Sequence, residues 1–208
     1  MSRRTKEEVV EEFRCASIQD AAMRVIARKG LDETTIQDIA DEAGIAKATV
    51  YVYFRDREEV FARTADGAFE RLVANLEPAF DAPGKFADRL LDLVQRQLRF
   101  FDENRALFRA TMALAQRDGD AHKKRSPAFG RYMQRLETMF AQAHESGELR
   151  ADIDPHAVAA IYRDCMRGVI LRRLEIPPNK QRISPEEEAA FVVSILLRGI
   201  GKSAGEKR

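Results

Sequence analysis

The chain has 208 residues, a length compatible with one large domain or two small ones. Hydrophobic residues make up 45% of it and charged residues 33%, which is ordinary for a globular protein and argues against global disorder. Because 35 Lys and Arg face 34 Asp and Glu, the net charge of +1 favours neither nucleic acid nor a membrane as partner.

Signals for membrane insertion or secretion are weak. The longest apolar run without a charge, residues 189–197, is far shorter than the ~20 residues that span a bilayer. No apolar stretch follows the basic first residues, so we expect no secretory signal. Cys15 and Cys165 are too far apart in sequence to suggest a disulfide framework or a metal site, and Cys165 is expected to be a small packing residue. We therefore expect a cytoplasmic protein with no membrane partner, no metal and no cofactor.

Helix signals begin at once. Thr5 and Glu8 have the spacing of a capping box, and the apolar stripe behind them stops at Gly30. Thr34 and Gln37 have the same spacing and predict the start of a second, short helix.

The next signals are a turn and two more helices. The second helix is expected to end near Ala43, with Gly44 after it. A third helix is expected over residues 47–53, and a fourth, capped by Asp56, to about Leu76.

The remainder also has helical periodicity. Asp154 before a proline and Ser184 before Pro185 and Glu187 are helix starts. The expected helices cover residues 86–101, 107–115, 129–143, 155–169 and 185–197. The sequence thus predicts an all-α fold of nine helices with no sheet.

Residues 34–60 carry the functional signal. Gly44 permits a sharp reversal between two short helices, and Val50 and Phe54, four residues apart, give the second of them an inward face. Its other side presents polar and aromatic groups, and no acidic residue lies between Glu42 and Asp56. This layout is typical of a helix-turn-helix that places its second helix in the major groove of DNA. Half-buried ring packing is the alternative for the tyrosines of this helix.

The same stretch resembles the DNA-binding domain of the TetR family of bacterial transcriptional regulators. The matching positions, between Ser17 and Phe61, are Ala21-Ala22, Lys29-Gly30, Thr35, Asp38-Ile39-Ala40, Ala43-Gly44-Ile45, Lys47, Thr49, Tyr51, Tyr53-Phe54 and Arg57-Glu58-Glu59. The stretch departs from the family's usual residues at Ala46, Val52 and Arg57. Beyond it, the chain resembles the family in length and helical architecture.

The resemblance implies a helix-turn-helix DNA-binding domain over residues 1–61 and a helical effector-binding and dimerisation domain over residues 62–208. It implies a ligand-responsive regulator, most simply a repressor, that binds a near-palindromic double-stranded DNA operator as a homodimer and releases it when a small effector binds. The residues implied in DNA contact are Thr35, Gln37, Lys47, Ala48, Thr49, Tyr51, Val52, Tyr53 and Arg57.

Two further sets of residues are candidates for the effector and the dimer contact. The effector candidates lie on the apolar stripes of the middle helices, whose Phe and Met content points to a lipophilic ligand: Gln97, Phe101, Phe108, Thr111, Met112, Tyr132, Met133, Tyr162 and Met166. For the polar members, a hydrogen bond within the core is the alternative. The dimer candidates share the apolar face of the last helix: Phe191, Val192, Ile195, Leu196 and Gly199.

Charge and chemistry limit other functions. Residues 1–61 hold ten Lys and Arg against thirteen Asp and Glu, so DNA binding must rely on local cations and neutralise few phosphates. The sequence has no evident nucleophile–base pair, metal cluster or phosphate loop, so we expect no enzyme. A helical adaptor that binds protein without DNA is the other alternative.

Overall fold

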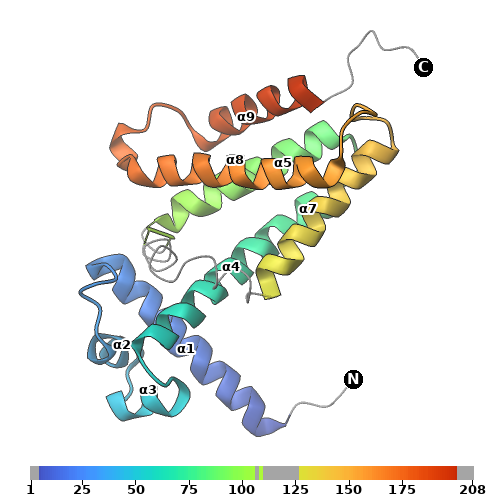
Figure 1. Ribbon diagram of the computed structural model, residues 1–208. Helices are drawn as coiled ribbons and strands as arrows, with labels where there is room; N and C mark the ends of the chain where they lie inside the picture. The colour runs from blue at the N-terminus through green and yellow to red at the C-terminus, as the bar shows by residue number, and fades with distance from the viewer. Residues whose placement is uncertain (1–4, 106–107, 110–126, 201–208) are drawn as a thin grey trace. The chain divides into compact units, whose positions relative to one another are not determined.

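The computed structural model describes residues 5–105, 108–109 and 127–200. Within these ranges the regular elements are eight α-helices and one short 3-10 helix (Figure 1). The predicted all-α fold is confirmed. Of the expected helix over residues 107–115, only Phe108 and Arg109 are described, and both are helical.

The chain divides into two compact units. The first comprises Met1–Glu70 with Asn104–Ser126, and the second comprises Arg71–Glu103 with Pro127–Arg208. Helix α4, Arg57–Asp81, contributes residues to both units. The domain boundary expected after residue 61 also falls within this helix.

Helix α1, Lys6–Lys29, begins and ends where the sequence predicts. The Thr5 hydroxyl accepts a hydrogen bond from the Glu8 amide at 3.2 Å, and the Glu8 carboxylate accepts one from the Thr5 amide at 2.8 Å. This is the expected capping box. Gly30 ends the helix with φ 83°, a positive value that glycine adopts without steric cost.

Helix α2, Ile36–Ala43, corrects one predicted cap. The capping residues are Thr35 and Asp38, one position later than the Thr34 and Gln37 expected. Thr34 is instead buried and donates its hydroxyl hydrogen to the Gly30 carbonyl at 2.6 Å. Both pairs have suitable spacing, but the Thr34 hydroxyl is engaged with Gly30, so Thr35 is the residue that caps the helix.

Helix α3, Lys47–Tyr53, has the predicted bounds, and α4 starts at the predicted cap, where Asp56 accepts a hydrogen bond from the Glu59 amide at 2.7 Å. The end of α4 differs from the expectation. The helix passes Leu76 and Pro78 and continues to Asp81. Its last turn carries the buried Phe80, and this packing holds the helix together beyond the proline.

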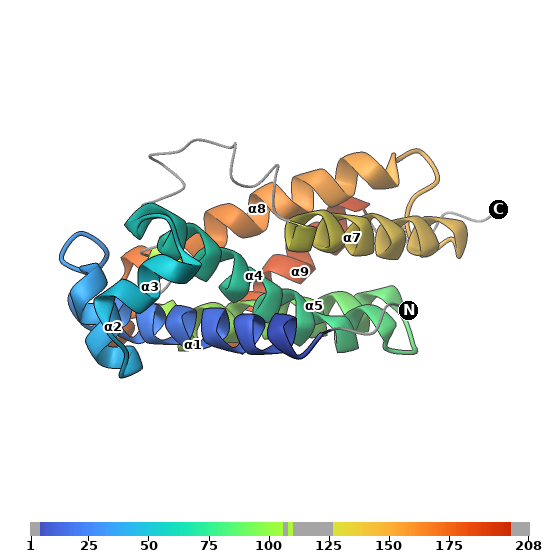
Figure 2. The same cartoon turned by 90° about the horizontal axis from the view of Figure 1, so that it is seen from below.

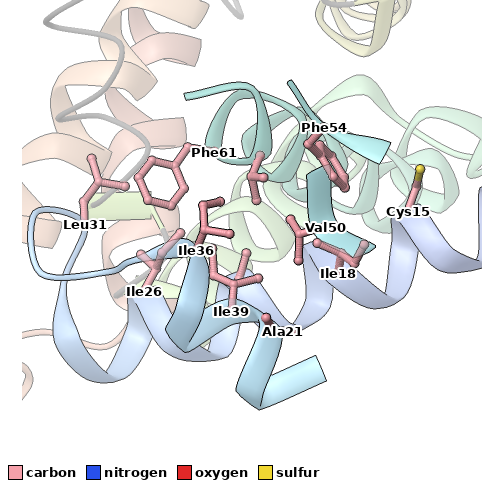
Figure 3. Packing of buried hydrophobic residues seen from close by; sticks show 13 residues of the cluster. Cys15, Ile18, Ala21, Ile26, Leu31, Ile36, Ile39, Val50, Phe54 and Phe61 are labelled. Atoms are coloured by element: carbon pink, nitrogen blue, oxygen red, sulfur yellow. The ribbon is translucent and has the colours of Figure 1, made fainter. Parts of the chain in front are cut away.

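A hydrophobic cluster at the centre of the helix-turn-helix holds its helices together (Figure 3). Helices α2 and α3 both contact α1 and each other. The cluster consists of Cys15, Ile18, Ala21, Ala22, Ile26, Leu31, Ile36, Ile39, Ala40, Val50, Phe54, Val60 and Phe61. The two helices that flank the turn are therefore held in place by their contacts with α1 and with each other.

The second unit is all-helical. Besides the end of α4 it contains α5, Phe86–Glu103; α7, Pro127–Glu145; α8, Pro155–Glu175; the 3-10 helix Pro178–Lys180; and α9, Pro185–Ile200. Helix α7 lies alongside α8, and α9 contacts α5 (Figures 1 and 2). The caps predicted at Asp154 and Ser184 are confirmed. The Cys165 side chain is exposed, so its expected role as a packing residue is wrong for the single chain.

Candidate nucleic-acid interface

The turn before α3 fixes which face of that helix points outward. Gly44 adopts the left-handed conformation, with φ 66° and ψ 34°, and the Ile45 amide donates to the Ala40 carbonyl at 3.0 Å. Val50 and Phe54 are then buried in the cluster. The opposite side of α3 faces away from the core of its unit.

The exposed face of α3 is partly apolar. The Val52 side chain is 75% exposed and that of Tyr51 49%, and Lys47 and Ala48 are exposed as well. Thr49 is half-buried. Tyr53 is half-buried and packs against the cluster, so the alternative of ring packing applies to Tyr53 and not to Tyr51.

The remaining DNA-contact candidates have partners within the protein. Thr35 is exposed, and its hydroxyl is 2.7 Å from the Asp38 carboxylate. The Gln37 amide donates to the Asp41 carboxylate at 2.8 Å. Arg57 donates to the Thr34 carbonyl at 3.2 Å, which brings the first residue of α4 to the start of α2.

Acidic residues of α2 pair with the cations of α1, an arrangement that the sequence analysis missed. Glu42 accepts hydrogen bonds from Arg24 at 2.7 Å and from Arg28 at 3.1 Å, and these bonds lower the pKa of its carboxyl group. Lys29 donates to Asp38 at 2.5 Å, and this bond, more than those from Thr35, lowers the Asp38 pKa to about 2. These ion pairs engage three of the ten cations of residues 1–61 and leave the acidic surplus of that stretch unchanged.

Arg63 is a second residue that sequence reasoning missed. Its guanidinium lies 4.8 Å from the centre of the Phe54 ring and donates to the Tyr53 carbonyl at 3.4 Å. It thereby caps the end of α3 from α4. No local spacing signals this contact, because the partners belong to different helices.

The second unit brings three of the effector candidates together. Gln97 of α5, Tyr132 of α7 and Tyr162 of α8 are all buried. The Tyr162 hydroxyl donates to the Gln97 side-chain oxygen at 3.1 Å, and the Gln97 side-chain nitrogen donates to the Tyr132 hydroxyl at 3.3 Å. Burial raises the pKa of Tyr132 to about 12 and that of Tyr162 well above its ordinary value. The three side chains form a neutral, buried, hydrogen-bonded centre.

The other effector candidates do not all lie in the same unit. Phe101 and Met166 are buried in the second unit and Met133 is half-buried there, whereas the buried Phe108 belongs to the first unit. Thr111 and Met112 lie outside the described residues.

The dimer candidates on α9 have graded exposure. The side chains of Phe191 and Ile195 are 63% and 54% exposed, and Gly199 is exposed. Leu196 is half-buried, and Val192 is buried in its own chain. On α8, Ile161 is 61% exposed.

The described ranges contain neither a metal-ligand cluster nor a membrane-spanning helix. No group of three or more His, Cys, Asp and Glu residues suited to a metal ion occurs there. No helix in the described part of the chain is long and apolar enough to cross a membrane.

A buried core beneath two short helices, with a glycine turn between them and an exposed second helix, defines a helix-turn-helix DNA-binding protein. Comparison with known families agrees. Residues 18–64 match the family described as bacterial regulatory proteins, tetR family, and residues 81–181 match a tetracyclin repressor-like C-terminal domain. The chain belongs to the TetR family.

Individual relatives support the same assignment. The transcriptional regulator AcrR of Shigella flexneri is 26% identical over 95% of this chain and 93% of its own length. The transcriptional repressor KstR2 of Mycobacterium tuberculosis is 25% identical over 73% of this chain and 76% of its own. The fatty acid degradation regulator FadR of Bacillus halodurans shares the fold, with a TM-score of 0.76, 17% identity and full coverage of both chains. The protein is therefore a DNA-binding transcriptional regulator and not an enzyme.

Proposed function

We propose that the protein is a cytoplasmic repressor that binds a near-palindromic operator as a homodimer and is released by a small, lipophilic effector. The observation that carries the DNA-binding part is the outward face of α3. Lys47, Tyr51 and Val52 are exposed there, while Val50 and the following Phe54 anchor this seven-residue helix in the core. A helix held this way presents its side chains to the bases at little cost in conformational entropy.

The dimer is proposed from α9. Phe191 and Ile195 are one helical turn apart and both are more than half exposed, which places two large apolar side chains on one solvent-facing stripe. Contact between this stripe and its copy across a two-fold axis removes it from water. Two recognition helices related by such an axis match successive major grooves when they lie about 34 Å apart.

The effector site is proposed around the Gln97 centre. Its three polar side chains come from α5, α7 and α8 and are buried, and an aromatic ring lies beside each phenol: Phe140 is 5.7 Å from Tyr162 and Phe80 is 6.5 Å from Tyr132, between ring centres. A lipophilic molecule with one hydrogen-bonding group can form a hydrogen bond to one of these side chains in place of one of the internal hydrogen bonds. Because the phenols stay neutral, the chemistry favours an uncharged polar group over a cation.

The coupling is proposed to run through α4, whose residues belong to both units. An effector that binds one conformer of the second unit more tightly favours that conformer, and α4 then carries Arg57 and the recognition helix to a different spacing in the dimer. Operator affinity falls by the factor by which the effector prefers that state.

One experiment tests the DNA-binding part directly. Genomic fragments bound by the full-length protein are recovered by pull-down and sequenced, and gel shifts measure affinity for the shared site. We expect a near-palindrome bound with nanomolar affinity. A protein that binds no duplex at low salt but retains its fold would instead be a helical adaptor. An effector that binds the protein without changing operator affinity would contradict the proposed coupling.

A further inference from the structure

The most exposed large apolar residue among the described residues lies in the last turn of the recognition helix. Val52 is 75% exposed, whereas Val50 on the same helix is fully buried. At 100° per residue, Val52 lies about 160° around the helix from both Val50 and Phe54. It therefore points directly away from the core that anchors α3.

Ala48 extends the same surface. It precedes Val52 by four residues, which puts the two side chains on one face of α3, and it is exposed. Lys47 and Tyr51, also four residues apart, form the neighbouring stripe. The outermost face of the helix is therefore a narrow strip of methyl groups with a cation and a phenol along one side.

Lys47 is the one side chain of the helix of a type that reads bases by paired hydrogen bonds, and it lies beside the apolar strip rather than on it. The helix sequence, KATVYVY, contains no Arg, Asn, Gln, Asp or Glu. Arg or Lys on guanine and Asn or Gln on adenine are the usual bidentate contacts in the major groove. The thymine C5 methyl group is the one apolar feature that a base edge presents there, and an aliphatic side chain is its matching partner.

We infer that this regulator reads its operator through thymine methyl groups, with Ala48 and Val52 as the specificity-determining residues. The inference rests on the proposed operator binding and adds the chemistry of the recognised base. Each half-site then contains thymine at the one or two positions that face Val52. Lys47 and Tyr51 bind phosphate and set the depth of the helix in the groove.

The test replaces thymine by deoxyuridine, which removes one methyl group and keeps every hydrogen bond. A duplex that the full-length protein selects from a randomised library is synthesised with single deoxyuridines at each thymine. Burial of one methyl group stabilises by about 0.8 kcal/mol, so we expect about fourfold weaker binding for a sensitive position and about fifteenfold when both half-sites are changed. Deoxyuridine in the flanking DNA is the control and leaves affinity unchanged.

A protein variant, combined with the deoxyuridine substitutions, tests whether Val52 is the residue that contacts the methyl group. In Val52→Ala the sensitivity to deoxyuridine at the facing position disappears, while the melting temperature stays the same because Val52 is exposed. Retention of full sensitivity in this variant overturns the assignment of Val52. Selected half-sites without thymine, or deoxyuridine with no effect anywhere, overturn the inference as a whole. Failure to select any common site contradicts the proposed function itself, so the two failures are distinguishable.

Discussion

Arg173 of α8 and Glu188 of α9 form a salt bridge in which each side chain is only 5% exposed, with guanidinium nitrogen and carboxylate oxygen 2.6 Å apart. Asp102, near the end of α5, accepts a hydrogen bond from the same guanidinium at 2.6 Å. A buried charge is costly unless it is paired and hydrogen-bonded, and Arg173 meets both conditions. This ion pair cluster connects three helices of the second unit.

Glu188→Gln should destabilise the second unit. The substitution keeps the shape of the side chain but removes one of the two carboxylates that face the buried guanidinium. Because Asp102 still pairs with Arg173, we expect a loss of about 2 kcal/mol, the contribution of a hydrogen bond between charged groups. Urea unfolding measures the change. Glu186→Gln is the matched control, because Glu186 pairs with Arg99 at an exposed site, where an ion pair contributes at most about 1 kcal/mol. Equal unfolding midpoints for the two variants would contradict the argument.

Asp38 should titrate well below its ordinary pKa of 3.8. Its pKa is lowered to about 2, first by the hydrogen bond from Lys29 and then by those from Thr35. Because the folded value lies below the unfolded one, the carboxylate stabilises the fold above about pH 4, and this contribution is lost as the pH falls toward 2. NMR titration of the side-chain carboxyl measures the pKa.

Lys29→Met is the informative variant for this titration. It removes the main cause of the shift, so the Asp38 pKa should rise toward 3.8. Lys47→Met is the control, because Lys47 lies on α3 and makes no part of the Asp38 shift. An Asp38 pKa that is the same in all three proteins would contradict the assigned cause.

These contacts show what the sequence could and could not predict. The bounds of α3 follow from local signals, namely the glycine turn and the four-residue spacing of Val50 and Phe54. The cap of α2 was misplaced by one residue because two adjacent threonines offer equivalent spacing, and they are told apart only by the bond of Thr34 to the Gly30 carbonyl, which leaves Thr35 as the cap. The ion pairs were missed for a different reason. Arg173 and Glu188 meet only after α8 and α9 have packed, and helical periodicity does not specify which face meets which.

Among the effector candidates, polarity on an apolar stripe identified Gln97, Tyr132 and Tyr162 individually. That they bond to one another is a property of the packed unit. Gln97→Leu should destabilise it by about 1–3 kcal/mol, since the Tyr162 hydroxyl loses its buried acceptor.

The double variant Gln97→Leu with Tyr162→Phe gives a sharper test. Removal of both partners leaves no unpaired group between them, so its loss of unfolding free energy should be smaller than the sum of the two single losses. Urea unfolding of the four proteins provides the cycle. Simple additivity would mean that this hydrogen bond does not couple the two residues.

Ile195→Asp should convert the proposed dimer to a monomer. A carboxylate on the apolar stripe of α9 meets its copy across the two-fold axis, where two like charges repel and lose solvent. Analytical ultracentrifugation measures the mass, and gel shifts should show at least tenfold weaker operator binding because the two half-sites are no longer linked. Val9→Asp on α1, at a similarly exposed apolar position, is the control. A mass unchanged by Ile195→Asp would exclude this stripe as the interface.

Lys47 provides the last prediction, because it is the one charged side chain on α3. With several cations of α1 paired to α2, we expect the dimer to neutralise about four to six phosphates, which gives a plot of log affinity against log salt a slope of about −4 to −5.

Lys47→Met removes one phosphate contact in each protomer and should reduce that slope by about 2, with a similar loss of affinity for every DNA sequence. Val52→Ala should leave the slope unchanged and alter only the preference among sequences, because a methyl contact releases no counterion. Binding isotherms at several salt concentrations separate the two effects. A wild-type slope steeper than −10, or the same slope in Lys47→Met, would show that the phosphate contacts come from other parts of the molecule.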